Sequence, residues 1–345
     1  MSARIAGFGW ITPLGAEPDL VWERLTRGEV AETQEVTNPE SGRIHRYVPV
    51  PPKLVESLAR NPRLRRSSSI SYFAVAAGLA ALEGAGLKMT PETAARTAVV
   101  FAITDGGVLY TRRFYEQIVK QGANAASPLL FPETVYNAPA SHLAAQLGID
   151  GASYTLVGDS SVGLAAVHFA EQLLATSDID QCVVVGAEEC DWVLCEAYAD
   201  WRLARTPLAE GAAALVLSRS GDIEIQAHAG APFFHQREAG AALQGVLATL
   251  QGSESAELVV RSANGTFVDR AEAVALAVQH GDTPAFFPKR SFGEAPGAGA
   301  LMQVITAILA LKKRCLRSAL VPVVGFNQQV SAAVVTQASN LPADT

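Results

Sequence analysis

The sequence predicts an α/β protein with buried sheets, and three observations lead to this prediction. Short runs rich in β-branched residues alternate with longer segments rich in Ala and Leu, which is the order of strand and helix in α/β folds. Hydrophobic residues make up 49% of the 345 residues and charged residues only 18%, so the chain can bury a large core. The same order of strand, helix, strand and strand closes both parts of the chain.

The first part of the chain contains one clear βαβ unit. A strand at residues 153–157 leads into a tight turn at 158–160, a helix at 162–176 and a strand at 181–185. The helix at 70–86 is apolar nearly all round, which is typical of a buried helix. The other elements expected in this part are strands at 4–8, 97–103, 212–218 and 223–227.

A similar order recurs in the second part. The elements expected there are strands at 257–261, 283–287, 320–324 and 331–337 and helices at 268–280 and 297–313. We expect residues 1–220 and 221–338 to form two halves of one compact unit, because each half alone leaves a sheet face exposed. The segment 31–52 is expected to be a surface excursion, and 339–345 a flexible tail.

Charge and cysteine content exclude several classes of function. The net charge of -7 argues against a surface built to bind nucleic acid. Four cysteines are too few for a disulfide scaffold at this length and fit a reducing compartment. No targeting signal is visible, and the longest uncharged run, at 295–311, falls short of a membrane span. We therefore expect a cytoplasmic protein with no membrane span.

The most informative segment is YTLVGDSSVGLAAV at residues 154–167. A strand, a Gly-containing turn and an apolar helix place Ser160 at a helix N-terminus, where free N–H groups stabilise an anion or oxyanion. A serine nucleophile at this position needs a nearby base. The alternative is that Asp159 or Ser160 simply caps the helix. These residues alone leave both interpretations open.

The order of motifs along nearly the whole chain resembles the β-ketoacyl synthases of the thiolase superfamily. The motifs that carry this resemblance are IAGFGWITPLG near the start, the turn at 158–160, TPLAEGAAALVL at 206–217, SANGTFVDRAEAVAL from 262, PKRSFGEAPGAGALMQ from 288 and GFN at 325–327. The resemblance implies the thiolase fold, with two pseudo-repeated halves in alternating α-β-α-β-α layers. It also implies a dimer.

The same resemblance assigns five site positions in this chain. Ser160 takes the place of the family's nucleophilic cysteine, and Asn264 and Glu294 take the places of its two catalytic histidines. Lys289 matches the family's lysine, and Phe326 matches the phenylalanine whose backbone N–H helps to form the oxyanion hole. The resemblance implies no cofactor and no metal.

These replacements argue against chain extension by the family's usual mechanism. A helix N-terminus can turn a thiol into a thiolate, but a serine hydroxyl needs a general base. Asn264 has no useful basicity, and the anion of Glu294 disfavours the build-up of enolate charge during malonyl decarboxylation. Among the remaining histidines, His235 is the one candidate for a remote base.

Three interpretations of function follow, so whether the chain is an enzyme stays open at this point. The first is a partner of an active ketosynthase in a heterodimer, resembling the chain-length factors of type II polyketide and aryl polyene systems. The second is an acyltransferase that uses Ser160 as its nucleophile. The third is a homodimer that binds an acyl ligand without chemistry. An acyl carrier protein or acyl-coenzyme A is a possible further partner in each case.

Overall fold

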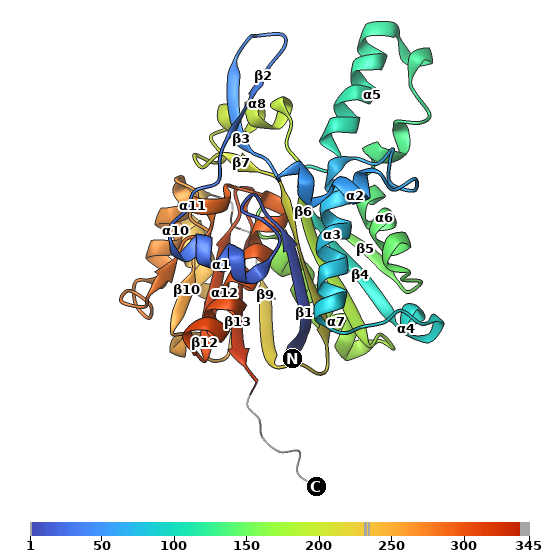
Figure 1. Ribbon diagram of the computed structural model, residues 1–345. Helices are drawn as coiled ribbons and strands as arrows, with labels where there is room; N and C mark the ends of the chain where they lie inside the picture. The colour runs from blue at the N-terminus through green and yellow to red at the C-terminus, as the bar shows by residue number, and fades with distance from the viewer. Residues whose placement is uncertain (1, 231–232, 234, 339–345) are drawn as a thin grey trace.

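A computed structural model describes residues 2–230, 233 and 235–338, so the expected tail at 339–345 lies outside the described residues. Ten strands form one hydrogen-bonded sheet in the order β11-β10-β12-β13-β9-β1-β8-β6-β4-β5 (Figure 1). The order divides naturally into two groups of five strands, one from each half of the chain.

The first group consists of β1 (Ala3–Ile11), β4 (Thr97–Ile103), β5 (Ser153–Val157), β6 (Gln181–Glu188) and β8 (Gly211–Ser218). Strands β5, β4 and β6 run parallel, whereas β6, β8 and β1 pair antiparallel. Strand β4 is buried along its whole length, as its uninterrupted apolar sequence TAVVFAI predicts for a strand covered on both faces.

The second group repeats this arrangement. It consists of β9 (Ile223–Ala229), β10 (Leu258–Val260), β11 (Ala285–Phe286), β12 (Ser318–Val324) and β13 (Val330–Gln337). Strands β11, β10 and β12 run parallel, and β12, β13 and β9 pair antiparallel. Each half therefore has three parallel strands followed by two antiparallel ones, which confirms the pseudo-repeated halves implied by the resemblance.

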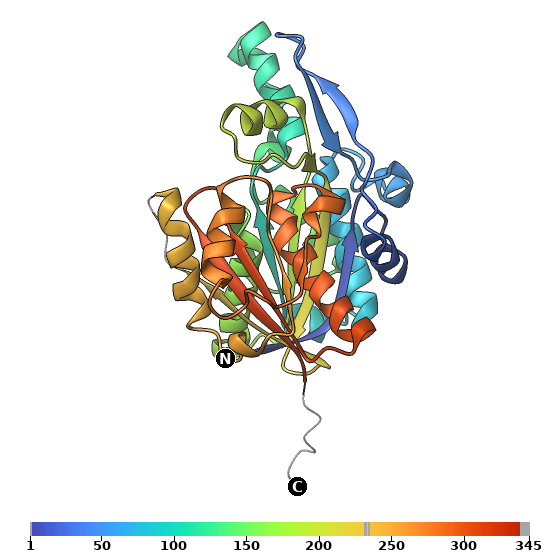
Figure 2. The same cartoon turned by 90° about the vertical axis from the view of Figure 1, so that its left-hand side faces the viewer.

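Helices complete five layers (Figure 2). The middle layer holds α7 (Val162–Thr176) and α12 (Pro296–Arg314), which contact each other and strands of both halves. Helices α3 (Ser69–Gly84) and α6 (Ala138–Leu147) cover the first group of strands, and α9 (Ala239–Leu247) and α10 (Phe267–Leu276) cover the second. The expected α-β-α-β-α layering is thus confirmed.

The two strand groups are joined where β1 meets β9. Ala3, Arg4 and Ile5 pair with Ile225, Glu224 and Ile223, and beyond these residues the two strands diverge. The join adds a backbone connection between the halves to the packing of α7 and α12 in the middle layer. The division into residues 1–220 and 221–338 as two halves of one compact unit stays a prediction.

Two glycines of β1 allow α3 to pack closely on the sheet. A Cβ atom on Gly7 would lie 2.3 Å from the backbone nitrogen of Ala85, and one on Gly9 would lie 2.6 Å from the carbonyl oxygen of Ala77. Backbone atoms cannot move aside as a flexible side chain can. The GFG sequence at residues 7–9 is therefore explained by helix–strand contact.

The segment 31–52, expected to be a surface excursion, contains a hairpin of β2 (Gln34–Thr37) and β3 (Ile44–Val48). Strand β3 also pairs with β7 (Leu208–Ala209), which makes a second, three-stranded sheet. Glu196 of α8 (Trp192–Asp200) holds the hairpin, because its carboxylate accepts hydrogen bonds from Asn38 and Arg43 and contacts His45 at 2.7 Å. Alternation is weak in these short strands, so the sequence pattern did not separate them from loops.

The remaining helices surround this framework. They are α1 (Pro18–Thr26), α2 (Glu56–Ala59), α4 (Pro91–Ala95), α5 (Val108–Gln121) and α11 (Lys289–Phe292). Helix α5 projects beyond the strand layers at the top of Figure 1. Among the residues that the structure describes, no helix combines the length and apolar character needed to cross a bilayer.

Candidate functional site

The turn at residues 158–160 joins β5 to α7, as the sequence pattern predicted. Ser160 is 3% exposed, and its hydroxyl does not cap the helix. The carboxylate of Asp159 instead accepts hydrogen bonds from the backbone N–H (2.9 Å) and the hydroxyl (2.8 Å) of Ser161. Asp159 therefore fixes the turn through the N-cap residue Ser161, but neither Asp159 nor Ser160 caps the helix with its side chain, so the capping interpretation is wrong. The Ser160 hydroxyl is left for another partner.

That partner is Glu294, which lies between α11 and α12. The Ser160 hydroxyl donates a hydrogen bond of 3.2 Å to Oε1 of Glu294. Lys289, at the start of α11, donates from Nζ to both carboxylate oxygens, at 2.7 and 2.8 Å. Three of the five predicted site residues thus form one cluster, called here the Ser160–Glu294–Lys289 cluster.

The cluster is sealed from solvent. Lys289 is 3% exposed and Glu294 0% exposed, so their ion pair lies in the interior. A buried ion pair tolerates little disturbance, because removing either partner leaves an uncompensated charge in a poorly solvated site. Transfer of the Ser160 proton to Glu294 would neutralise the carboxylate and leave the Lys289 ammonium group unpaired. The geometry is that of a nucleophile beside a base, but Lys289 opposes the proton transfer.

Asn264 does not join this cluster. Its amide nitrogen donates to the carbonyl oxygen of Leu203 at 3.1 Å, and its amide oxygen accepts from the N–H and the hydroxyl of Thr266 at 3.2 and 2.6 Å. These bonds hold a buried corner between the end of α8 and the start of α10. In this structure the Asn264 side chain stabilises a loop, and none of its hydrogen bonds goes to Ser160 or Glu294.

Phe326 lies in the turn between β12 and β13, beside the Ser160 turn. Its half-buried ring packs edge-on against Tyr198, with 5.4 Å between ring centroids. Asp159 joins the two turns, because its Oδ2 accepts a hydrogen bond of 2.8 Å from the N–H of Asn327. A Cβ on Gly325 would lie 1.9 Å from Oδ2 of Asp159, so only glycine fits there. Asp159 is a positioning residue that the resemblance did not indicate.

The sequence reasoning also missed a buried acidic pair next to this site. Glu188, at the end of β6, accepts hydrogen bonds from the N–H groups of Gly297 (2.8 Å) and Asp105 (3.2 Å). Burial raises the pKa of Glu188 well above its ordinary value, and burial raises the pKa of Asp105 to about 6, opposed by a hydrogen bond from the Tyr198 hydroxyl. A signal was present in the sequence: two consecutive glutamates stand at the end of the apolar run CVVVGA in QCVVVGAEE.

The histidines of the described residues supply no base for Ser160. His235 is exposed, at the start of a short 3-10 turn, so it is not the remote base that the sequence suggested. His168 lies on α7 eight residues beyond Ser160, which corresponds to about 12 Å along a helix. No hydrogen bond links a histidine to Ser160, Glu294 or Lys289 within the part of the chain that the structure describes.

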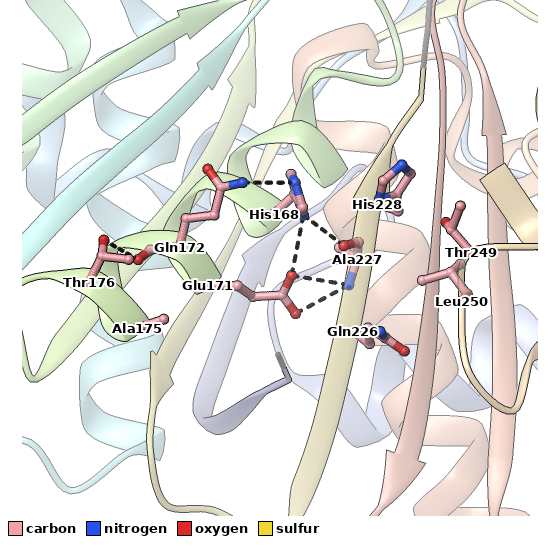
Figure 3. Close-up of a pocket in the computed structure, with 10 residues that line it drawn as sticks. All are labelled: His168, Glu171, Gln172, Ala175, Thr176, Gln226, Ala227, His228, Thr249 and Leu250. Carbon is pink, nitrogen blue, oxygen red and sulfur yellow. Dashed lines mark hydrogen bonds and ion pairs between the residues drawn. The ribbon is translucent and has the colours of Figure 1, made fainter.

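His168 instead lines a separate cavity of about 320 Å³ (Figure 3). Its Nδ1 bonds to the carbonyl oxygen of Ala227 at 2.9 Å, and its ring lies 5.4 Å from that of His228. The hydrogen bond with Glu171 raises the pKa of His168, whereas burial lowers the pKa of His228. Glu171 in turn accepts a hydrogen bond from the N–H of Ala227. His168 and Glu171 therefore bond the backbone of β9 where it no longer pairs with β1.

Metal binding finds no support in the described residues, since none of them form a group of three or more His, Cys, Asp or Glu side chains suited to a metal ion. Cys182, Cys190 and Cys195 are buried free thiols, and Cys315 is exposed. Burial raises the pKa of Cys195 to about 12, which makes it an inert thiol at neutral pH.

Comparison with known proteins identifies the family. Residues 3–222 match the model of the β-ketoacyl synthase N-terminal domain, which is more than half of the chain. The 3-oxoacyl-[acyl-carrier-protein] synthase 2 of Vibrio cholerae serotype O1 is 24% identical over 192 residues. This alignment covers 54% of the present chain and 45% of the relative, so the chain spans about half the length of the curated protein it matches.

Solved structures show the same fold over nearly the whole chain. A β-ketoacyl synthase from Burkholderia phymatum STM815 superposes with a TM-score of 0.85 at 17% identity, covering 98% of this chain and 99% of that one. The ishigamide ketosynthase/chain length factor superposes with a TM-score of 0.82, also at 17% identity and with the same coverage. With the matched domain model and the five-layer fold in agreement, the chain belongs to the β-ketoacyl synthase family.

Proposed function

We propose that this protein is a non-extending partner of an active ketosynthase and acts like a chain-length factor in fatty acid or polyketide-type biosynthesis. The observation that carries this proposal is the buried Ser160–Glu294–Lys289 cluster. A hydroxyl stands at the nucleophile position, and a buried ion pair fills the space beside it. The hydroxyl is closed to an acyl donor in this conformation, because Ser160 is 3% exposed and bonded to Glu294.

The charge of Glu294 supports the same proposal. Decarboxylation of a malonyl group builds up enolate charge, which hydrogen-bond donors stabilise and a nearby carboxylate opposes. Glu294 is 0% exposed, so little water screens its field. Lys289 compensates this charge within the ion pair, because its ammonium group donates to both carboxylate oxygens. The cluster suits a subunit that leaves chain extension to its partner.

The edge of the sheet at β5 is the surface we assign to the ketosynthase partner. Strand β5 pairs only with β4, so its other backbone edge is open, and Val157 at its end is 54% exposed. Large apolar side chains are also exposed on α5 and on the segment between α5 and α6. They are Tyr115, Val119, Leu129, Phe131, Val135 and Tyr136. An open, partly apolar edge of this kind is typical of strand-to-strand association.

Helix α5 would face the partner from the same side. Its one fully buried residue is Val108, although its sequence is strongly amphipathic. Phe114 packs against Phe131, which follows in the same exposed segment, with 5.8 Å between ring centroids. A projecting helix with unburied aromatic residues can form part of the wall of a partner's acyl tunnel, and so limit chain length.

A charge on the β5 edge tests this proposal. Val157→Lys should abolish co-purification with a co-expressed ketosynthase, because an ammonium group would be buried in the interface. Val274→Lys is the matched control, since Val274 on α10 is a valine of nearly the same exposure, 53% against 54% for Val157. The proposal is wrong if the Val157 variant still binds the ketosynthase and supports full product formation, or if the unaltered chain binds no ketosynthase.

A second candidate function is acyl transfer by Ser160. The hydrogen bond of 3.2 Å from Ser160 to Glu294 favours it, because it brings a carboxylate that can accept a proton next to the hydroxyl. Intact-protein mass after incubation with acyl-coenzyme A and acyl-carrier donors tests it. An adduct that is lost in Ser160→Ala would establish a nucleophile, whereas no adduct with any donor would leave the hydroxyl chemically silent.

The third interpretation, a homodimer that binds an acyl ligand without chemistry, is separated from the first by the composition of the assembly. Light scattering of the purified chain and of the co-expressed pair distinguishes self-association from a one-to-one complex. A cytoplasmic location stays a prediction from the sequence.

A further inference from the structure

A cavity of about 470 Å³, lined by residues of both halves of the chain, has three arginines in its lining. Arg202 and Arg205 follow helix α8, and Arg270 belongs to α10. None of the described residues that line this cavity is an aspartate or a glutamate. The cavity is called here the arginine cavity, and it lies outside the buried Ser160–Glu294–Lys289 cluster.

The three guanidinium groups have no counterion among the residues that the structure describes. Within the described ranges none of them forms an ion pair or a side-chain hydrogen bond, and all three residues are exposed. Other arginines of this chain are paired, for example Arg43 with Glu196 and Arg96 with Asp180. Gathering three like charges without a carboxylate costs electrostatic free energy. In a chain of net charge -7, such a group points to an external anion.

The backbone holds two of these arginines in place. The N–H of Arg205 donates to the carbonyl oxygen of Asn264 at 3.0 Å. Gly265 has φ +85, and a Cβ there would lie 2.8 Å from Cβ of Arg205, so glycine makes room for the arginine stem. Arg202 itself adopts φ 55, a left-handed conformation that is unfavourable for a residue with a side chain. The side chains are therefore presented by a defined loop.

An aromatic side chain completes the arginine cavity. Trp201 is 72% exposed, the most exposed tryptophan or phenylalanine among the large apolar residues at the surface, and it lines the cavity beside Phe267. An exposed indole offers a face on which a planar ring can stack, and guanidinium groups bind phosphate oxygens in pairs. The volume falls within the usual range of about 300–1,000 Å³ for small-molecule sites.

We propose that the arginine cavity binds a nucleoside diphosphate, either free or as the nucleotide end of a larger coenzyme such as coenzyme A. The phosphates would lie between Arg202, Arg205 and Arg270, and the base would stack on Trp201. This proposal goes beyond the function proposed above, because it requires neither the Ser160 hydroxyl nor a ketosynthase partner.

Titration of the full chain with ADP, coenzyme A and inorganic pyrophosphate tests the proposal, with calorimetry and tryptophan fluorescence as readouts. ADP should bind, its affinity should fall as salt is raised, and it should quench the fluorescence of Trp201. Pyrophosphate should bind at least about tenfold more weakly, because it lacks the ring. Equal affinity for ADP and coenzyme A would assign the site to the nucleotide alone, and tighter coenzyme A binding would assign it to the coenzyme.

Single substitutions identify the residues responsible. Arg205→Ala and Arg270→Ala should each weaken ADP binding about tenfold or more, and Trp201→Ala should reduce it to the level of pyrophosphate. Arg63→Ala is the matched control, since Arg63 is also exposed and has no ion pair among the described residues but lies outside the cavity. Thermal unfolding confirms that each variant is folded. Failure of ADP and coenzyme A to bind, equal binding of pyrophosphate, or unchanged affinity in the arginine variants would overturn the proposal.

Discussion

At the scale of single residues, a serine and a buried ion pair stand where the family has its catalytic cysteine and a catalytic histidine. Ser160 lies where a nucleophile would stand, but its hydroxyl is bound to a carboxylate that already forms a buried ion pair with Lys289. Asp159 binds the N–H of the N-cap residue Ser161 and fixes the turn that carries Phe326. The polar groups of the turn are thus bonded within the protein and hold its structure. For this reason we propose a non-extending role.

Lys289→Met should destabilise the protein strongly. The substitution leaves the Glu294 carboxylate buried without its cation, a change that costs about 3–5 kcal/mol of unfolding free energy. The double variant Lys289→Met with Glu294→Gln should recover part of this loss, because no buried charge remains. Chemical denaturation measures both, and Lys53→Met, on an exposed lysine, serves as the control. A loss below 1 kcal/mol in the single variant would show that the ion pair is not structural.

Glu210 should make stability depend on pH. Burial raises the pKa of this carboxyl group to about 7 in the folded chain, against an ordinary value of 4.5. The neutral acid therefore contributes stability below about pH 4.5, and this contribution is lost as the pH rises through about 7. The unfolding free energy should decrease between pH 5 and pH 8, and in Glu210→Gln this decrease should be smaller by roughly 2–3 kcal/mol. An unchanged slope in the variant would mean that the carboxyl group is ionised when buried.

At the scale of elements, sequence periodicity predicted most of the framework. Strands β4 and β5 and helix α7 were predicted to the residue, because each has a strong apolar pattern bounded by turn residues. The hairpin β2–β3 was missed, since its stability comes from pairing with β7 and from the ionic contacts of Glu196. Of the residues that the resemblance assigned to the site, Ser160, Glu294 and Lys289 lie together in the structure. Asn264 does not join them, because its side chain forms local hydrogen bonds that no sequence pattern encodes.

Close packing between α3 and β1 can be tested with one added methyl group. Gly7→Ala should lower the unfolding free energy by about 3 kcal/mol, because the new Cβ would overlap backbone atoms of Ala81 and Ala85. Gly245→Ala is the opposite case. Gly245 belongs to helix α9, and a Cβ added there would have no atom within 4 Å. That variant should gain about 0.5–1 kcal/mol from helix propensity. Equal effects in thermal unfolding would refute the packing explanation.

At the scale of the whole molecule, the two halves repeat one topology and enclose two buried helices between them. This arrangement places the start of α7 and the start of α12 at the same site, because both helices follow parallel strands of corresponding position. The open β5 edge and the projecting helix α5 lie on the first half, whereas the arginine cavity is lined by residues of both halves. The surface proposed for a protein partner and the cavity proposed for an anionic ligand therefore share no residue.

Product formation by the co-purified complex with Ser160→Ala in this chain tests the central claim most directly. The account predicts that the variant complex assembles normally and forms product at nearly the rate of the unaltered complex, with the same chain length. The result that would contradict the account is a complete loss of product from a complex that still assembles, because Ser160 would then be required for the chemistry.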